Sequence, residues 1–157
     1  MGKRRWVILM IVGKTCCRFE SCPLNKLINQ IIYKTMKGIE IYNEKAKEMY
    51  NMVSAVCAEC VAANVRTKYG VFFEFFGHVE LVRVYVKENK SPISLVVFDK
   101  DLYINVVEAK KLTAANIDLE TGRINGRLAT MVGIIKFLKG LGGVAAEVEQ
   151  FTASANL

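Results

Sequence analysis

The chain has 157 residues, of which 52% are hydrophobic and 24% charged, and its formal net charge is +7. This length and composition indicate one globular domain of ordinary size and exclude a largely disordered chain. The five cysteines have no regular spacing, which argues against a secreted disulfide framework and favours a reducing compartment. We therefore predict a cytoplasmic location.

The positive charge is concentrated near the beginning of the sequence. Residues 1–35 contain seven lysines and arginines against Glu20 alone, so they carry +6 and residues 36–157 carry only +1. The apolar run Trp6–Val12 is far shorter than the roughly 20 residues that span a bilayer. No small-x-small cleavage pattern follows it, so a signal peptide is not indicated either.

These features predict three parts. We expect residues 1–35 to be a basic leader that is disordered or lies upstream of a true start at Met36. Residues 36–151 are expected to form a single α+β domain, and residues 152–157 a tail.

Helical spacing dominates the next part of the chain. Apolar residues recur every three or four positions over Leu24–Tyr33 and again from Ile41 to Tyr69. The pattern predicts a short helix followed by a long one, and Gly70 is typical of a helix stop.

The apolar period then changes to two. Val71–Phe76, Val79–Lys87 and Ser94–Phe98 have the composition of strands, and short polar links join them. Three such strands in succession predict an antiparallel meander with one buried face.

Helix is expected again over Leu102–Leu112, because capping carboxylates precede it. Gly122–Leu128 has the composition of a brief strand or tight turn. The last clear helix is expected from about Ala129 to Leu141, and Val144–Phe151 to form at most a final helical turn.

Three segments of this pattern resemble the sterol carrier protein family of lipid-binding domains, over about residues 41–143. They are Gly70–Phe75, Ser91–Leu102, and Thr121–Leu128 followed by Met131 and Phe137-Leu138. The resemblance implies an α+β fold in which helices cover a mixed or antiparallel sheet of about five strands. It also implies a tunnel between the sheet and the C-terminal helix that binds a fatty acyl chain, a sterol or another lipid.

The predicted walls of this tunnel are apolar side chains of the sheet and of the closing helix. Each buried methylene of an acyl chain contributes about 0.8 kcal/mol, so even partial enclosure gives appreciable affinity. The same side chains are equally compatible with a filled core, because protein interiors normally pack without voids. The predicted ligand-binding residues are Phe73, Phe75, Val82, Val84, Val86, Leu95, Val97, Met131, Ile134, Ile135 and Leu138.

Other chemistry is weakly indicated. Cys57 and Cys60 form a CxxC motif, but it lies within a predicted helix rather than at a helix start after a strand, which favours buried structural thiols. His78, the only histidine, has no partner for acid–base work at short range. The sequence therefore predicts no enzymatic activity, no catalytic residue, no metal and no cofactor.

Two alternative functions stay open. Exposed aromatic side chains such as Phe72 and Phe76, or the C-terminal helix, would suit a protein–protein interaction module or accessory subunit with a filled core, including a homodimer. The basic residues 3–34 would suit nucleic acid, which is the weaker alternative because the later cations are balanced by acids. Membrane contact is expected to be transient at most.

Overall fold

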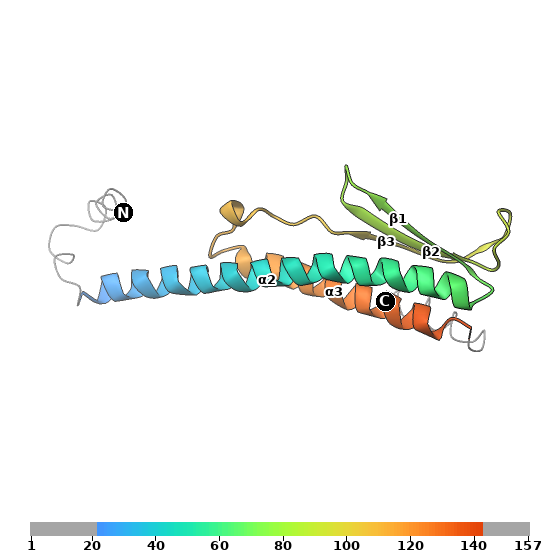
Figure 1. The fold of residues 1–157 in the computed structure, drawn as a ribbon. Coiled ribbons are helices and arrows are strands. Elements are labelled where there is room, and N and C mark those ends of the chain that lie inside the picture. Colours follow the sequence, from blue (N-terminus) through green and yellow to red (C-terminus); the bar gives the residue numbers. More distant parts are fainter. Residues whose placement is uncertain (1–21, 143–157) are drawn as a thin grey trace.

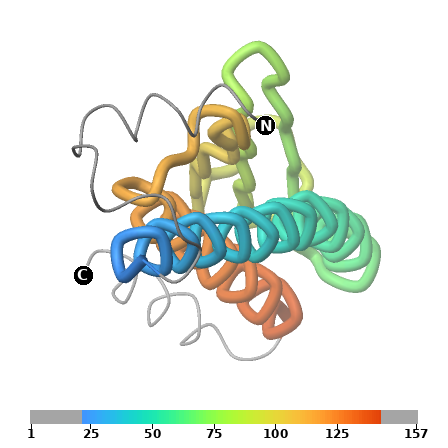
Figure 2. The backbone as a smooth tube through the Cα atoms, turned by 90° about the vertical axis from the view of Figure 1, so that its left-hand side faces the viewer, coloured from blue at the N-terminus to red at the C-terminus, as the bar shows by residue number. Residues whose placement is uncertain are grey.

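The computed structural model describes residues 22–142. They form two layers, a pair of helices and a three-stranded sheet that lies on one side of the pair (Figures 1 and 2). The α+β class predicted from the sequence is confirmed. The elements are α2 (Pro23–Arg66), β1 (Gly70–Phe76), β2 (Leu81–Lys87), β3 (Val96–Tyr103), the 3-10 turn η1 (Ala109–Lys111) and α3 (Ile117–Gly140).

Helix α2 is one continuous element of 44 residues, where the sequence predicted two helices. At 1.5 Å per residue it is about 66 Å long. Pro23 occupies the first turn, where its missing N–H is no loss. Gly38 does not break the helix; a Cβ there would lie 2.9 Å from Cδ1 of Ile117, so the glycine admits the start of α3.

The sheet is the antiparallel meander that the alternating pattern predicts, in the order β1-β2-β3. Val84, at its centre, pairs with Phe73 on β1 and with Lys100 on β3. Residues 22–142 contain these three strands, so the expected sheet of about five strands is not confirmed within this range.

The helix predicted over Leu102–Leu112 is wrong. Strand β3 continues to Tyr103 because β2 offers it a partner along its whole length, with Leu81 opposite Tyr103. Of the following residues only Ala109–Lys111 are helical, as the short turn η1.

The strand or turn predicted over Gly122–Leu128 is also wrong, since these residues lie inside α3. The two glycines suggested a break, but Gly122 and Gly126 have open space where a Cβ would be, so they lie on the solvent side of the helix. Buried Ile124 and Leu128 on the opposite side fix the helix by tertiary packing, which outweighs the low helix propensity of glycine.

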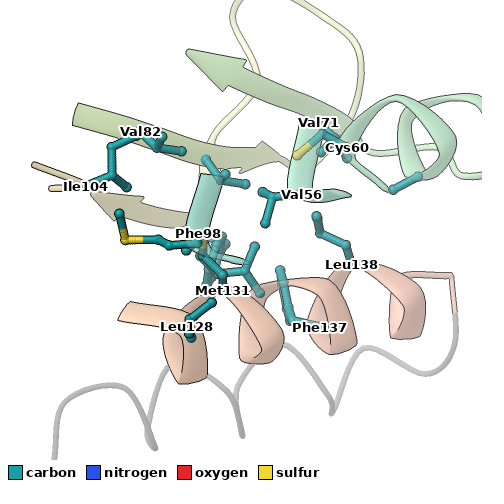
Figure 3. Close-up of a cluster of buried hydrophobic side chains, with 14 of the residues drawn as sticks. Val56, Cys60, Val71, Val82, Phe98, Ile104, Leu128, Met131, Phe137 and Leu138 are labelled. Carbon is teal, nitrogen blue, oxygen red and sulfur yellow. The ribbon is translucent and has the colours of Figure 1, made fainter. Parts of the chain in front are cut away.

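The core lies between α2, α3 and the inner face of the sheet (Figure 3). All three contribute side chains with almost no exposed surface, such as Met49, Val84 and Leu138. Arg66 joins the ends of the two helices, since its guanidinium donates to the carbonyl of Leu138 at 2.6 Å and pairs with Glu59 at 2.7 Å. The helices therefore run parallel, and both end at the same end of the molecule (Figure 1).

Candidate functional site

Most of the residues predicted to line a tunnel do come together. Nine of the eleven belong to the hydrophobic core cluster or pack against it. Six are buried and three are half-buried, so the sequence located this apolar region correctly. The buried six are Val82, Val84, Val86, Met131, Ile134 and Leu138, and the half-buried three are Phe73, Val97 and Ile135.

The other two predicted residues lie outside this cluster. Phe75 is 55% exposed although it follows the inward alternation of β1, because the β1–β2 hairpin rises away from the helices (Figure 1). Leu95 is 73% exposed because β3 begins only at Val96. A bulge between β2 and β3 then shifts the alternation.

The sequence did not identify an aromatic pair that joins β3 to α3. The rings of Phe98 and Phe137 stack with their centroids 4.4 Å apart and an interplanar angle of 29°. Both side chains are buried. They fill part of the interval between the sheet and α3, which is where the tunnel was predicted (Figure 3).

The outer face of the sheet carries an ordered set of aromatic and charged side chains. Phe72 stacks on Tyr85 at 4.7 Å, and the hydroxyl of Tyr85 donates to Glu74 at 3.2 Å. The Arg83 guanidinium donates to both carboxylate oxygens of Asp99 and lowers the pKa of that carboxyl. The predicted exposure of the aromatic strand is confirmed for both Phe72 and Phe76, and the ring of Phe72 stacks on that of Tyr85.

The two thiols of the CxxC motif differ in burial, and Cys57 is the more accessible of the two. Cys60 is buried in the core, and this burial raises the pKa of its thiol to about 12. A thiol with so high a pKa stays protonated at neutral pH and is a poor nucleophile. Among the described residues no group of three His, Cys, Asp or Glu side chains is placed to hold a metal ion.

The clearest apolar surface lies on the first part of α2. Residues 23–37, called the arm below, project beyond the start of α3 at Ile117 (Figures 1 and 2). Leu27 is 52% and Ile31 49% exposed, and Ile32 is similarly exposed. With half-buried Leu24 and Ile28 they form a band, the arm stripe: Leu24, Leu27, Ile28, Ile31 and Ile32.

The arm stripe continues the side of α2 that forms the core. Residues 24, 28, 31, 42 and 49 of this helix fall within a narrow sector when successive residues turn by 100°. The later two, Tyr42 and Met49, are fully buried, and the Tyr42 hydroxyl donates to the carbonyl of Val107 at 3.0 Å. One helix side is therefore core in one part of α2 and half-exposed in the other.

The arm is also the basic part of the described structure. It contains Lys26, Lys34 and Lys37, and no acidic residue occurs between residues 22 and 39. With the preceding segment it accounts for the entire net charge, because residues 1–37 carry +7 and residues 38–157 are neutral overall.

Comparisons with known proteins give no assignment: no protein-family model matches this chain, and neither a curated protein nor a solved structure matches it. Neither of the two long helices of residues 22–142 combines the length and apolarity needed to cross a membrane.

The sequence contained the signal for the arm stripe, but the predicted boundary at residue 35 separated the stripe from the buried side of the same helix. That boundary falls inside α2. Following the three- and four-residue spacing from Leu24 through Ile31 to Tyr42 would have shown that one helix side is shared by both parts.

Proposed function

We propose that this chain is a non-catalytic module that associates with a second copy of itself through the arm stripe. The observation that carries this proposal is the continuation of the core-forming side of α2 beyond the point at which α3 begins. An interaction module with a filled core was one of the functions left open by the sequence.

The arm stripe gains from being covered. Moving a leucine or isoleucine side chain from full exposure to full burial contributes about 1.5–3 kcal/mol. Leu27 and Ile31 are about half-exposed, so complete burial of each would contribute roughly half of that free energy. Because it projects beyond the start of α3, the arm also has little of the tertiary packing that supplies most helical stability in proteins. A second polypeptide against the stripe would stabilise both its side chains and its backbone.

A second copy suits this surface because α2 is continuous and carries the arm away from the helix and sheet packed on its later part (Figure 1). This side of α2 already packs against a helix in its later part, since α3 begins beside Gly38. The outer face of the sheet is a poorer candidate, because its charged groups are paired with each other.

The proposal is tested by the mass of the full chain as a function of concentration, measured by sedimentation velocity. We expect a monomer–dimer equilibrium that Leu27→Ser with Ile31→Ser shifts at least about tenfold toward monomer. The matched control is Val61→Ser with Val65→Ser, which changes two still more exposed residues of the same helix away from the stripe. A wild-type chain that stays monomeric, or an arm variant that dimerises normally, would refute the proposal.

Binding of an apolar ligand between the sheet and α3, in a sterol-carrier-like arrangement, is a second candidate. It is supported by the nine predicted lining residues that meet there. The experiment is organic extraction of the purified chain followed by mass spectrometry. A stoichiometric lipid that is lost in Met131→Trp would favour the carrier, and a chain that is empty and retains its thermal stability would exclude it.

A further inference from the structure

We infer that the loop between β2 and β3 inserts its apolar tip into the surface of a membrane that contains anionic lipid. The loop covers residues 88–95 and lies at the end of the molecule at which α2 and α3 end, where it projects past both helices (Figure 1). The membrane contact is independent of the proposed self-association, because the arm lies at the other end of α2.

The tip of this loop is strongly apolar and almost fully exposed. Ile93 is 92% exposed, more than any other large apolar side chain of residues 22–142. Leu95 is 73% and Val96, the first residue of β3, is 50% exposed. A single exposed leucine or isoleucine is ordinary at a protein surface, but three apolar side chains within four residues form a compact patch. Ile93, Leu95 and Val96 are called the apolar tip below.

Hydrogen bonds between its own polar groups hold the loop in shape. The Ser94 hydroxyl donates to the carbonyl of Asn89 at 2.9 Å, and the N–H of Ser91 donates to the Asn89 side chain at 2.8 Å. The N–H of Glu88 donates to the carbonyl of Leu95 at 2.9 Å and closes the loop. Polar groups that already have partners lose little when water is removed, so this loop suits insertion at a bilayer surface.

Lysines lie around the apolar tip. Lys90 is exposed within the loop, and the ammonium of Lys87 donates to a carbonyl of the loop at 3.1 Å. A Cβ on Gly70 would lie 2.9 Å from another carbonyl oxygen of the loop, which places Lys68, two residues earlier, beside it. Against these three lysines the loop contains one acid, Glu88. Lysines near a bilayer surface attract anionic head groups, and the apolar side chains between them enter the boundary with the acyl chains.

A bilayer suits this patch better than a nucleic acid or a protein does. A nucleic acid would pair with the lysines but would leave Ile93 and Leu95 in water, since residues 88–96 include no aromatic side chain on which a base could stack. A protein partner would need a pocket shaped to the projecting Ile93, whereas fluid lipid adapts to such a side chain.

A tryptophan at the apolar tip tests the insertion in the full chain. Trp6 is the only tryptophan of the sequence, so Trp6→Phe with Ile93→Trp gives a single reporter, and Ile93 is too exposed for its replacement to disturb the core. We expect vesicles that contain phosphatidylserine to shift its emission to the blue, and brominated acyl chains in them to quench it. Vesicles of phosphatidylcholine alone should need at least about tenfold more lipid for half-quenching.

Two reporters elsewhere are the controls for position. Val79→Trp, with Trp6→Phe, places the tryptophan in the turn between β1 and β2, where Val79 is 42% exposed beside Glu80 and no lysine occurs in residues 77–80. Leu27→Trp, with Trp6→Phe, places it on the arm stripe. Both should keep their emission and stay unquenched.

Charge reversal in the chain with Ile93→Trp tests the role of the lysines. Lys68→Glu with Lys90→Glu should raise the lipid concentration for half-quenching at least about tenfold. Lys110→Glu with Lys111→Glu, two exposed lysines of η1, is the control of equal charge and should leave it unchanged.

The outcomes separate the membrane contact from the self-association. A reporter at position 93 that keeps its aqueous emission with phosphatidylserine vesicles, quenching at position 27 or 79 instead, or equal losses in the two charge variants would overturn the membrane contact and leave the self-association standing. A chain that is quenched at position 93 but stays monomeric at every concentration would overturn the self-association alone.

Discussion

Helix α2 has two parts that differ in their surroundings but not in their apolar pattern. From Gly38 to Ala63 the inward side contacts α3 and the sheet, and Met49, Val56 and Ala63 have almost no exposed surface. From Pro23 to Lys37 the equivalent side retains about half of its exposure. The difference shows that apolar periodicity marks one side of a helix as suited to packing. It does not show whether another part of the same chain packs there.

Charge separates the two parts as well. The later part of α2 contains acids as well as bases, for example in the ion pair between Lys45 and Glu48 at 2.7 Å, whereas the charged residues of the arm are all lysines. The arm therefore differs from the later part of α2 in its charge as well as in its exposure.

The largest expected effect is on the free energy of unfolding, which should respond strongly to a change in the core and weakly to a change in the arm. Leu138→Ala should lower the free energy of unfolding by about 2–5 kcal/mol, because it leaves a cavity among fully buried side chains. Ile31→Ala, measured at a concentration at which the chain is monomeric, should change it by less than about 0.5 kcal/mol. Urea titration followed by circular dichroism measures both; equal losses would show that the arm is part of the folded unit.

The next prediction concerns the glycines of α3. Gly126→Ala should raise the free energy of unfolding by about 0.5–1 kcal/mol, because the site is helical and open to solvent. Gly142→Ala is the contrasting control and should destabilise, since Gly142 has a φ of +100°. Thermal unfolding would contradict the account if Gly126→Ala were the more damaging change.

These glycines also show which elements of the fold could be predicted from the sequence and which could not. The meander was predictable because alternation in Val82, Val84 and Val86 is a local pattern. The later part of α3 was also predicted, as a helix from about Ala129 to Leu141. Its first part was not, because the glycines at 122 and 126 suggested a turn while the packing that fixes the helix there is tertiary.

The residues of the candidate site also divide into those that local patterns predicted and those that depend on tertiary packing. The apolar set between the sheet and the helices followed from alternation and helical spacing, and nine of its eleven members do meet. Phe75 and Leu95 could not be placed, because the lift of the hairpin and the bulge in β3 depend on how whole elements pack. The Phe98–Phe137 stack joins residues far apart in sequence and has no local signal.

The smallest expected effect is on the outer face of the sheet. The Arg83 guanidinium lowers the pKa of Asp99, so this pair stabilises the fold above the unfolded pKa of about 3.9, and the contribution is lost as the pH falls through the lower folded pKa. Both side chains are 40% exposed, so solvent screening keeps the contribution of the pair small. Asp99→Asn should therefore destabilise slightly at pH 7 and reach parity with the wild type near pH 2, as measured by urea titration. A constant difference at every pH would show that the ion pair is not its cause.

The central claim is that the arm stripe is covered by a second copy whereas the later part of α2 is covered within its own chain. Hydrogen exchange of the α2 amides in the full chain, measured at several protein concentrations, tests it most directly. The account predicts that amides of residues 42–63 are protected at every concentration and that those of residues 27–36 become protected only as the concentration rises. Protection of residues 27–36 that is independent of concentration would contradict it.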